Sequence, residues 1–216
     1  MYLDQIDMPP KFKDKTLKSF DADNLDDPTV VEKLKKFGIN IMEHRDKGTW
    51  VLLTGQYGIG KTHLAAATLR RALMAEAIMD AQEEAETGVP PRYGSEKGNI
   101  YIMVNANEYL RKIKSTYNGA GNAHEIIYKY RHARLLVLDD LGAESKSEHQ
   151  KEKLHDLLNY RYDHEAPTII TSNLDISGIG KHAGSRLADR IIEQTSQGEY
   201  IFSLSGESYR QQKRPS

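Results

Sequence analysis

The stretch TWVLLTGQYGIGKTHLA at residues 49–65 decides the fold of this chain. Residues 50–54 form a short apolar run, which predicts a buried strand. Residues 55–62 match the pattern G-x4-G-K-[ST] in full, and residues 63–86 are rich in Ala, Leu, Met and Glu, which predicts a helix. A glycine-rich loop that joins a strand to a helix is the context in which this pattern binds phosphate.

The residue types of this loop suit a nucleotide. Glycines let successive backbone N–H groups face one anion, and the N-terminus of the following helix adds its dipole. We expect Lys61 to neutralise the β- and γ-phosphates and Thr62 to offer its hydroxyl to Mg²⁺. The alternative, a glycine-rich turn without a ligand, is disfavoured because a second motif accompanies the loop. The predicted ATP-binding residues are Gly55, Gln56, Tyr57, Gly58, Ile59, Gly60, Lys61, Thr62 and His63.

The second motif is LLVLDD at residues 135–140, an apolar strand with two carboxylates at its carboxyl end. Ligands bind at that edge of a doubly wound sheet. We expect Asp139 to hold Mg²⁺ through its water shell and Asp140 to orient or deprotonate the attacking water, with Glu144 as the alternative base. Asn173 follows the next apolar run, PTIITS, and we expect it near the γ-phosphate. The alternative is that Asn173 only begins a turn.

Apolar runs alternate with helical stretches along the whole chain, which is typical of a parallel sheet covered on both faces. We expect strands at 50–54, 99–104, 134–139, 167–172 and 199–204. We expect helices at 29–47, 63–86, 107–116, 123–132, 149–163 and 186–194. The prediction is an α/β fold with a five-stranded parallel sheet, helices on both faces and a reduced or absent helical lid. Residues 1–28, with two prolines and an acidic cluster, predict an N-terminal arm or linker ahead of one domain at 29–216.

The composition excludes several classes of protein. Lys plus Arg is 30 and Asp plus Glu is 31, so the net charge of −1 excludes a strongly basic nucleic-acid coat but not a local basic patch. The absence of cysteine excludes disulfide frameworks, cysteine-ligated metals and thiol nucleophiles. No apolar run approaches the ~18 residues of a membrane span, and no signal-peptide pattern begins the chain. We therefore expect a cytoplasmic protein with no membrane partner.

Together these motifs resemble the AAA+ ATPases of the DnaC/DnaI/IstB group, the bacterial and phage helicase loaders and transposition helpers. The resemblance covers nearly the whole chain, from PPKF at 9–12 to ESYR at 207–210. Its most specific parts are LDDLGAE at 138–144 and RLADR at 186–190. It implies a P-loop ATPase that binds single-stranded DNA, assembles into an ATP-dependent homo-oligomer, and has a replicative helicase or a transposase as its partner.

The resemblance also implies roles for residues outside the two main motifs. Arg190 matches the arginine finger that reaches the ATP of a neighbouring subunit, and Arg186 lies on the same helix face one turn earlier. Arg210 stands where such proteins place a second nucleotide sensor. The stretch VNANEYLRKIKSTY at 104–117 matches an insertion that tracks single-stranded DNA. The DNA contacts expected there are Arg111, Lys112, Lys114 and Tyr117.

Three departures from the group leave alternatives open. Asp140 stands where many relatives carry Glu, so a nucleotide-gated adaptor with little hydrolysis is one alternative to an ATPase. Typical loaders carry a further N-terminal helicase-binding domain, so the resemblance implies a short form, and a transposition helper of the IstB kind is the other alternative. The acidic stretch 76–98 is longer than expected, and nothing in it predicts a function. A metabolic kinase is disfavoured because no small-substrate pocket or lid is recognisable.

Overall fold

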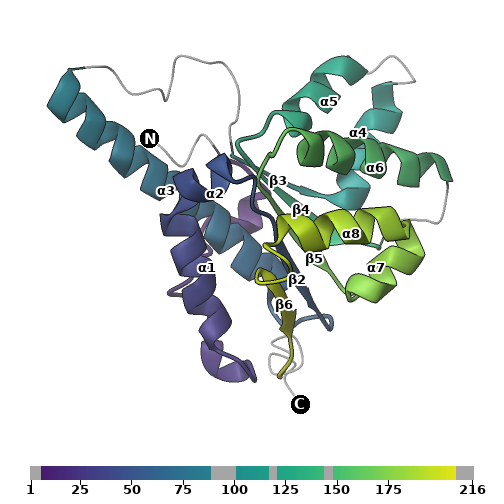
Figure 1. Cartoon of the computed structure of the whole chain (residues 1–216), viewed down its shortest axis with the longest axis horizontal. Helices are drawn as coiled ribbons and strands as arrows, with labels where there is room; N and C mark the ends of the chain where they lie inside the picture. The colour runs from purple at the N-terminus through teal and green to yellow at the C-terminus, as the bar shows by residue number, and fades with distance from the viewer. Residues whose placement is uncertain (1–5, 89–100, 117–120, 144–147, 208–216) are drawn as a thin grey trace.

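The computed structural model describes residues 6–88, 101–116, 121–143 and 148–207. Its centre is one parallel sheet with the strand order β1-β3-β4-β5-β2-β6 (Figure 1). The strands are β1 (Ile6–Asp7), β2 (Val51–Gly55), β3 (Tyr101–Asn105), β4 (Leu135–Leu141), β5 (Thr168–Ser172) and β6 (Ile201–Leu204). All five strands predicted from the sequence are present. The predicted number of five was nevertheless wrong, because β1 pairs with β3 as a sixth strand, and a strand of two residues is too short to show a periodic pattern.

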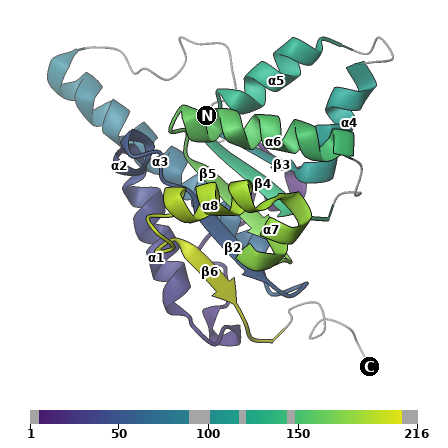
Figure 2. The same ribbon diagram turned by 45° about the vertical axis from the view of Figure 1, so that its right-hand side comes forward.

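Helices cover both faces of the sheet, as predicted. They are α1 (Thr29–Ile39), α2 (Ile41–Asp46), α3 (Lys61–Thr87), α4 (Ala106–Thr116), α5 (Ala123–Arg131), α6 (Glu148–Asp163), α7 (Ile176–Ala183) and α8 (Ser185–Gln194). One apolar core lies between the sheet and α1 with α3, and a second lies between the sheet and α4 to α8. Figure 2 shows α6, α7 and α8 lying over β2, β4 and β5. Successive side chains of β2 point to opposite faces of the sheet. Val51 and Leu53 therefore lie in the first core and Leu52 in the second, together with Trp50, which precedes β2.

Two helical predictions differ from the structure. The single helix expected at 29–47 is two helices that meet at Asn40. Helix α7 was not predicted, because Gly178 and Gly180 lower its intrinsic helix propensity. Its start is fixed instead by a side-chain cap, in which the carboxylate of Asp175 accepts a hydrogen bond of 2.6 Å from the backbone N–H of Gly178.

The predicted arm lies against the domain. Met8, Phe20 and Leu25 are buried in the core formed with α1 and α3. Leu25 forms an isolated antiparallel bridge with Gly206, just after β6. A Cβ at Gly206 would lie 2.0 Å from the carbonyl oxygen of Asn24, so only glycine allows this close approach. The boundary between arm and domain at residue 28 stays a prediction. The reduced lid also stays a prediction, because the described residues end at 207.

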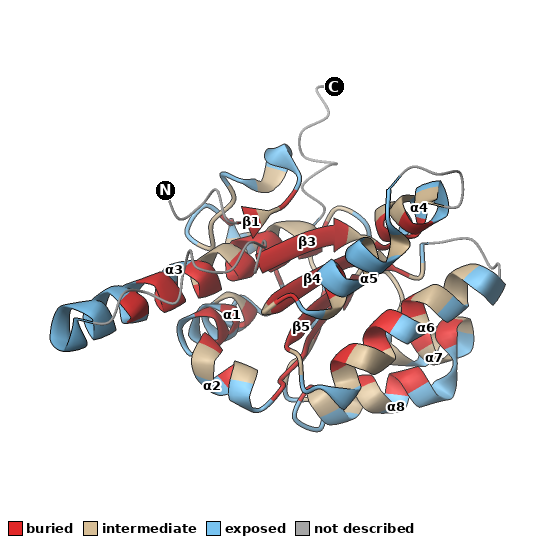
Figure 3. Ribbon diagram, turned by 90° about the horizontal axis from the view of Figure 1, so that it is seen from above, coloured by how far each residue is buried: buried red, intermediate tan, exposed pale blue. Residues whose placement is uncertain are grey.

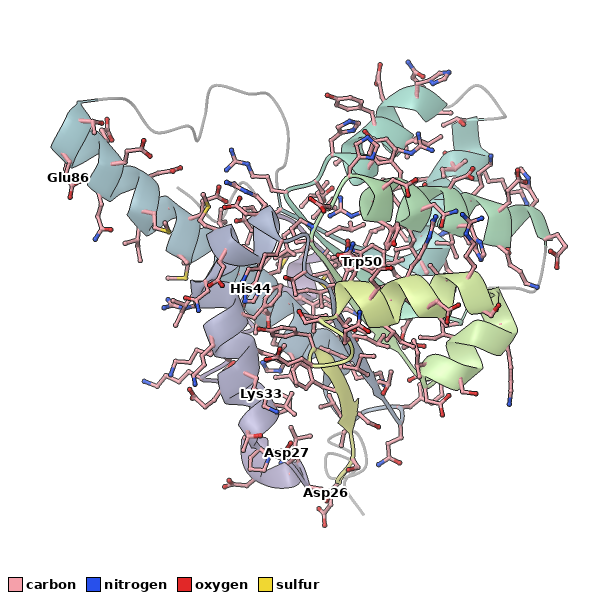
Figure 4. The ribbon with its side chains drawn as sticks, in the orientation of Figure 1. Asp26, Asp27, Lys33, His44, Trp50 and Glu86 are labelled. Atoms are coloured by element: carbon pink, nitrogen blue, oxygen red, sulfur yellow. The ribbon has the colours of Figure 1, made fainter. Side chains whose placement is uncertain are left out.

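Buried polar contacts hold the side of the fold where β4 and β5 begin, opposite the carboxyl ends of the strands. The guanidinium of Arg161 is fully buried and donates to the carbonyl oxygens of Tyr130, Arg131, Ala133 and Pro167. Trp50, labelled in Figure 4, donates from its indole N–H to the carbonyl oxygen of Ala166 at 2.9 Å. The distal half of α3 projects beyond the sheet and is mostly exposed at its tip (Figure 3). Within the described residues, none of the helices has the length and apolar character to cross a membrane.

Candidate nucleotide-binding site

The loop between β2 and α3 has the backbone that its glycines predict. Gly55, Gly58 and Gly60 have φ values of 136°, 83° and 105°, in the left-handed half of the map that favours glycine. A Cβ at Gly55 would lie 2.2 Å from the carbonyl oxygen of Leu204, so close packing against β6 adds a second reason for glycine there. Gly60 supplies no side-chain cap to α3. The first turn of a helix is where backbone N–H groups lack partners within the helix and can bind an anion.

Lys61 connects this loop to the end of β5. Its ammonium group is buried and donates to the carbonyl oxygens of Gly55 and Gln56 at 2.7 and 2.9 Å. It also donates to Oδ1 of Asn173 at 2.8 Å. Since β5 lies beside β2 in the sheet, a residue far along the chain reaches the loop. The structure thus brings Asn173 to the lysine that we expect to bind the phosphates.

Asp139 and Asp140 occupy an irregular part of β4. The register of β4 against β5 shifts between Leu138 and Leu141, and Asp140 has a φ of 58°, which is uncommon for a residue other than glycine. Thr171 of β5 holds both residues, because its hydroxyl donates to Oδ1 of the Asp139 carboxylate at 2.7 Å and accepts from the backbone N–H of Asp140 at 2.9 Å. This role of Thr171 was not predicted from the sequence.

The electrostatics of Asp139 suit a cation ligand. Burial, followed by the neighbouring charge of Asp140, raises the pKa of this carboxyl above its ordinary value, although interactions with Thr171, Thr62 and Lys11 oppose the shift. The side chains of Thr62 and Asp139 line the same cavity. Oxygen donors of this kind are the ligands that Mg²⁺ prefers, usually with several retained waters. The residues present fit the predicted ion.

A cavity of about 1410 Å³ surrounds these groups. Its walls come from the loop, the carboxyl ends of β3, β4 and β5, the first half of α4, and the arm. The arm contributes Met8, Lys11, Phe12, Lys15, Ser19 and Phe20 among other residues. A role of the arm in the site was not predicted from the sequence. The signal that could have indicated it is PPKF at 9–12, which is also part of the family resemblance.

Other residues predicted in the loop have different surroundings. Tyr57 is 68% exposed, and the side chain of Ile59 is buried in the core with α1 and α3. The amide of Gln56 donates to the carbonyl oxygen of Gly206 at 2.8 Å, beyond β6. The ring of His63 turns to the arm, and its Nε2 lies 3.0 Å from the carbonyl oxygen of Thr16.

The predicted DNA-binding residues of α4 are Arg111, Lys112 and Lys114, which we call the α4 basic cluster. Arg111 and Lys112 line the same cavity as the loop, and Lys114 is exposed in the last turn. Arg111 forms an ion pair with Glu108, and the ammonium of Lys112 donates to the hydroxyl of Tyr130 at 3.0 Å. The cluster is therefore divided between the cavity and the outer surface. Tyr117 lies outside the described residues.

The two arginines of α8 differ in their surroundings, and neither lines the cavity. Arg186 is exposed. The side chain of Arg190 is 13% exposed and lies against α6, where it contacts Asn159, Tyr162 and Asp163. Two further predicted residues, Glu144 and Arg210, lie outside the described chain.

Comparison with known proteins supports the resemblance seen in the motifs. The IstB-like ATP binding protein family matches residues 94–216, more than half of the chain. The replicative helicase loader DnaC of Escherichia coli is 22% identical over 141 residues, covering 65% of this chain and 49% of DnaC. A putative insertion sequence ATP-binding protein of Sinorhizobium fredii is 37% identical over 84 residues, covering 38% of this chain and 34% of that protein. A crystal structure of the DnaC helicase loader matches with a TM-score of 0.70 at 20% identity, covering 91% of this chain and 100% of that chain.

These similarities have different extents. The structural match confirms the predicted α/β fold of the AAA+ type over nearly the whole chain. The sequence matches are shorter, and the chain spans about half the length of the DnaC proteins that it matches.

Proposed function

This chain belongs to the IstB-like ATP binding protein family, and from that premise we propose that it is a Mg²⁺-dependent ATPase that loads a replicative helicase onto single-stranded DNA. One observation carries the proposal. Lys61, Thr62, Asp139 and Asn173 come from three separate strand ends and meet at one edge of the sheet. This is the arrangement that ATP hydrolysis by a P-loop protein requires, because catalysis of phosphoryl transfer rests mainly on positioning and charge stabilisation.

Each of these residues has a task in the proposed reaction. Lys61 exchanges its carbonyl acceptors for the β- and γ-phosphates, and Asn173, already in contact with Lys61, lies close to the γ-phosphate. Thr62 and Asp139 hold Mg²⁺, which neutralises charge on the phosphates. Asp140 orients the attacking water. Thr171 holds its irregular backbone, and the amide of Asn105 donates to Oδ2 of its carboxylate at 3.4 Å.

We propose that hydrolysis is completed between subunits of an ATP-dependent homo-oligomer. Arg186 and Arg190 lie outside the cavity of their own subunit, so a finger from α8 would act on a neighbour's nucleotide rather than on its own. Arg186 is exposed, while Arg190 must first leave its contacts with α6. A finger supplied in trans stabilises the charge that develops on the γ-phosphate.

The partner assignment rests on the relatives. DnaC is described as a replicative helicase loader, and a DnaC structure matches nearly the whole chain. The insertion-sequence relative and the IstB-like family favour the second candidate, an ATPase that assists a transposase. In either system the α4 basic cluster is proposed to contact single-stranded DNA, with Arg111 and Lys114 as its exposed members.

The proposal is tested by measuring ATP affinity, ATP turnover and partner binding with the same preparation. We expect the protein to bind Mg²⁺-ATP, and we expect Lys61→Ala to lose that binding with its fold intact by circular dichroism. We expect co-elution with the replicative helicase of its host in the presence of ATP, and none with a transposase. Unchanged ATP affinity in Lys61→Ala contradicts the site, and ATP-dependent co-elution with the transposase alone favours the second candidate.

A further inference from the structure

One wall of the nucleotide cavity is made by the arm rather than by the sheet and its helices. The described part of the arm begins with β1, beside β3 (Figure 3), and continues past the first turns of α3. Residues 7–12, 15 and 19–21 line the cavity together with the loop and α4. The shape of the cavity therefore depends on how firmly this segment is held.

A tight turn in the arm faces the residue that follows Thr62. Within this turn the backbone N–H of Thr16 donates to Oγ of Ser19 at 3.0 Å, and the backbone N–H of Ser19 donates to Oγ1 of Thr16 at 2.9 Å. These reciprocal bonds leave the carbonyl oxygen of Thr16 directed to α3, where Nε2 of His63 lies 3.0 Å away. A carbonyl oxygen only accepts, so Nε2 carries the proton and donates.

The ring of His63 makes a second contact with the arm. Phe20 is buried, and its ring meets the ring of His63 edge to face, with 5.2 Å between centroids and 89° between planes. Contacts of this geometry are favourable beyond the area that they bury. His63 thus holds both ends of the segment from 16 to 20, through a hydrogen bond at one end and a ring contact at the other.

A separate contact holds the arm two turns further along α3. Nη1 of Arg70 donates to the carbonyl oxygen of Lys13 at 2.5 Å. Arg70 does not line the cavity, so its effect on a bound nucleotide is through the arm alone. This contact offers an independent way to loosen the arm without touching the loop.

We infer that His63 is a positioning residue: it holds the arm in place as the wall of the nucleotide cavity, so that nucleotide affinity depends on arm docking. The inference rests on the proposed ATP site and gives His63, which the sequence predicts as an ATP-binding residue, an indirect role through the arm. Apparent affinity falls in proportion to the fraction of molecules with a competent cavity. Loss of one such hydrogen bond predicts about two- to tenfold weaker ATP binding.

The test compares His63→Ala, His63→Gln and Arg70→Ala with the unchanged protein. Glutamine has an N–H donor at about the reach of Nε2 but no aromatic ring. His63→Gln therefore distinguishes the effect of the hydrogen bond from the effect of the ring contact. His164→Ala, at the residue that follows α6, is the matched control for loss of an imidazole. Circular dichroism and thermal unfolding confirm that each variant is folded.

The first measurement is amide hydrogen exchange of residues 13–21 without nucleotide. We expect faster exchange in His63→Ala and Arg70→Ala, near-normal exchange in His63→Gln, and no change in His164→Ala. This result does not depend on whether the protein binds ATP. Unchanged exchange in His63→Ala overturns the inference and leaves the proposed function untouched.

The second measurement is the affinity for Mg²⁺-ATP and the turnover at saturation. We expect about two- to tenfold weaker ATP binding in His63→Ala and Arg70→Ala, recovery in His63→Gln, and kcat within about twofold of normal in all three. A direct phosphate contact by His63 instead predicts normal affinity in Arg70→Ala, and that outcome overturns the positioning role. If the unchanged protein binds no ATP, the proposed function fails, while the exchange result still decides whether His63 holds the arm.

Discussion

Arg190 provides the sharpest test of hydrolysis between subunits. In the described chain its guanidinium group lies against α6 and contacts three side chains, those of Asn159, Tyr162 and Asp163. A residue in this position either stabilises the subunit or is released to act on a neighbour. The substitution Arg190→Ala affects both, so a second substitution must separate them.

The structural contribution of Arg190 is modest. A guanidinium 4.5 Å from the centroid of the Tyr162 ring contributes about 0.5–1 kcal/mol at an accessible site. The ion pair with Asp163, whose side chain is 58% exposed, contributes about 0.2–1 kcal/mol at its N–O distance of 3.7 Å. With a net hydrogen bond to Asn159 of about 0.5–1.5 kcal/mol, we expect Arg190→Ala to destabilise the fold by roughly 1–3 kcal/mol. Urea denaturation measures this change.

The catalytic contribution is expected to be much larger. A finger in trans is worth ~10³-fold or more in rate, so Arg190→Ala should lower turnover by about that factor with little loss of ATP affinity. Asn159→Ala removes a contact that holds Arg190 in its own subunit but leaves the guanidinium present. We expect Asn159→Ala to keep or raise turnover, although its stability falls by about 0.5–1.5 kcal/mol, the contribution of that one hydrogen bond. Equal losses of turnover in the two variants would mean that Arg190 acts through the fold.

Mixing two inactive variants gives the decisive assay. Lys61→Ala lacks the phosphate-binding lysine and Arg190→Ala lacks the finger, so a mixed oligomer contains some interfaces with both groups intact. We expect partial recovery of turnover, and specific activity that rises with protein concentration. A mixture that co-assembles and stays inactive refutes the assignment of Arg190. The same experiment with Arg186→Ala, whose removal from the exposed surface should change stability by less than about 0.5 kcal/mol, then identifies the finger.

Three further outcomes are expected. Asp139→Ala should abolish Mg²⁺-dependent turnover, and Asp140→Asn should slow turnover while ATP still binds; normal hydrolysis in Asp140→Asn together with loss in Glu144→Gln would identify Glu144 as the base. Single-stranded DNA should bind better than duplex when ATP is present. Replacing the α4 basic cluster by alanine should reduce the slope of log affinity against log salt concentration, which filter binding measures. An unchanged slope would mean that the DNA binds elsewhere. Arg161→Met should destabilise the fold by about 3 kcal/mol or more in urea, because several buried carbonyl oxygens lose their donor, while ATP affinity at the opposite edge stays normal.

Much of the fold and of the site followed from local patterns. The five longer strands, the loop before α3 and the carboxylates at the end of β4 were all predicted, because apolar runs and glycine spacing act within a few residues. The short strand β1 and helix α7 were not predicted, since each depends on a neighbour or a cap more than on its own propensity. The family resemblance was equally local, carried by strings of four to fourteen residues.

The sequence by itself predicted which residues would bind phosphate and which acidic oxygens would hold a cation, because these expectations follow from residue type and spacing. Only the tertiary structure decided which of them meet. Parallel strands are joined by long crossovers, so their order in the sheet cannot be derived from their order in the chain, and that order brings Asn173 to Lys61 and Thr171 to Asp139. It also made the arm a wall of the cavity, since the direction of a side chain such as His63 is set by the surface against which its helix packs.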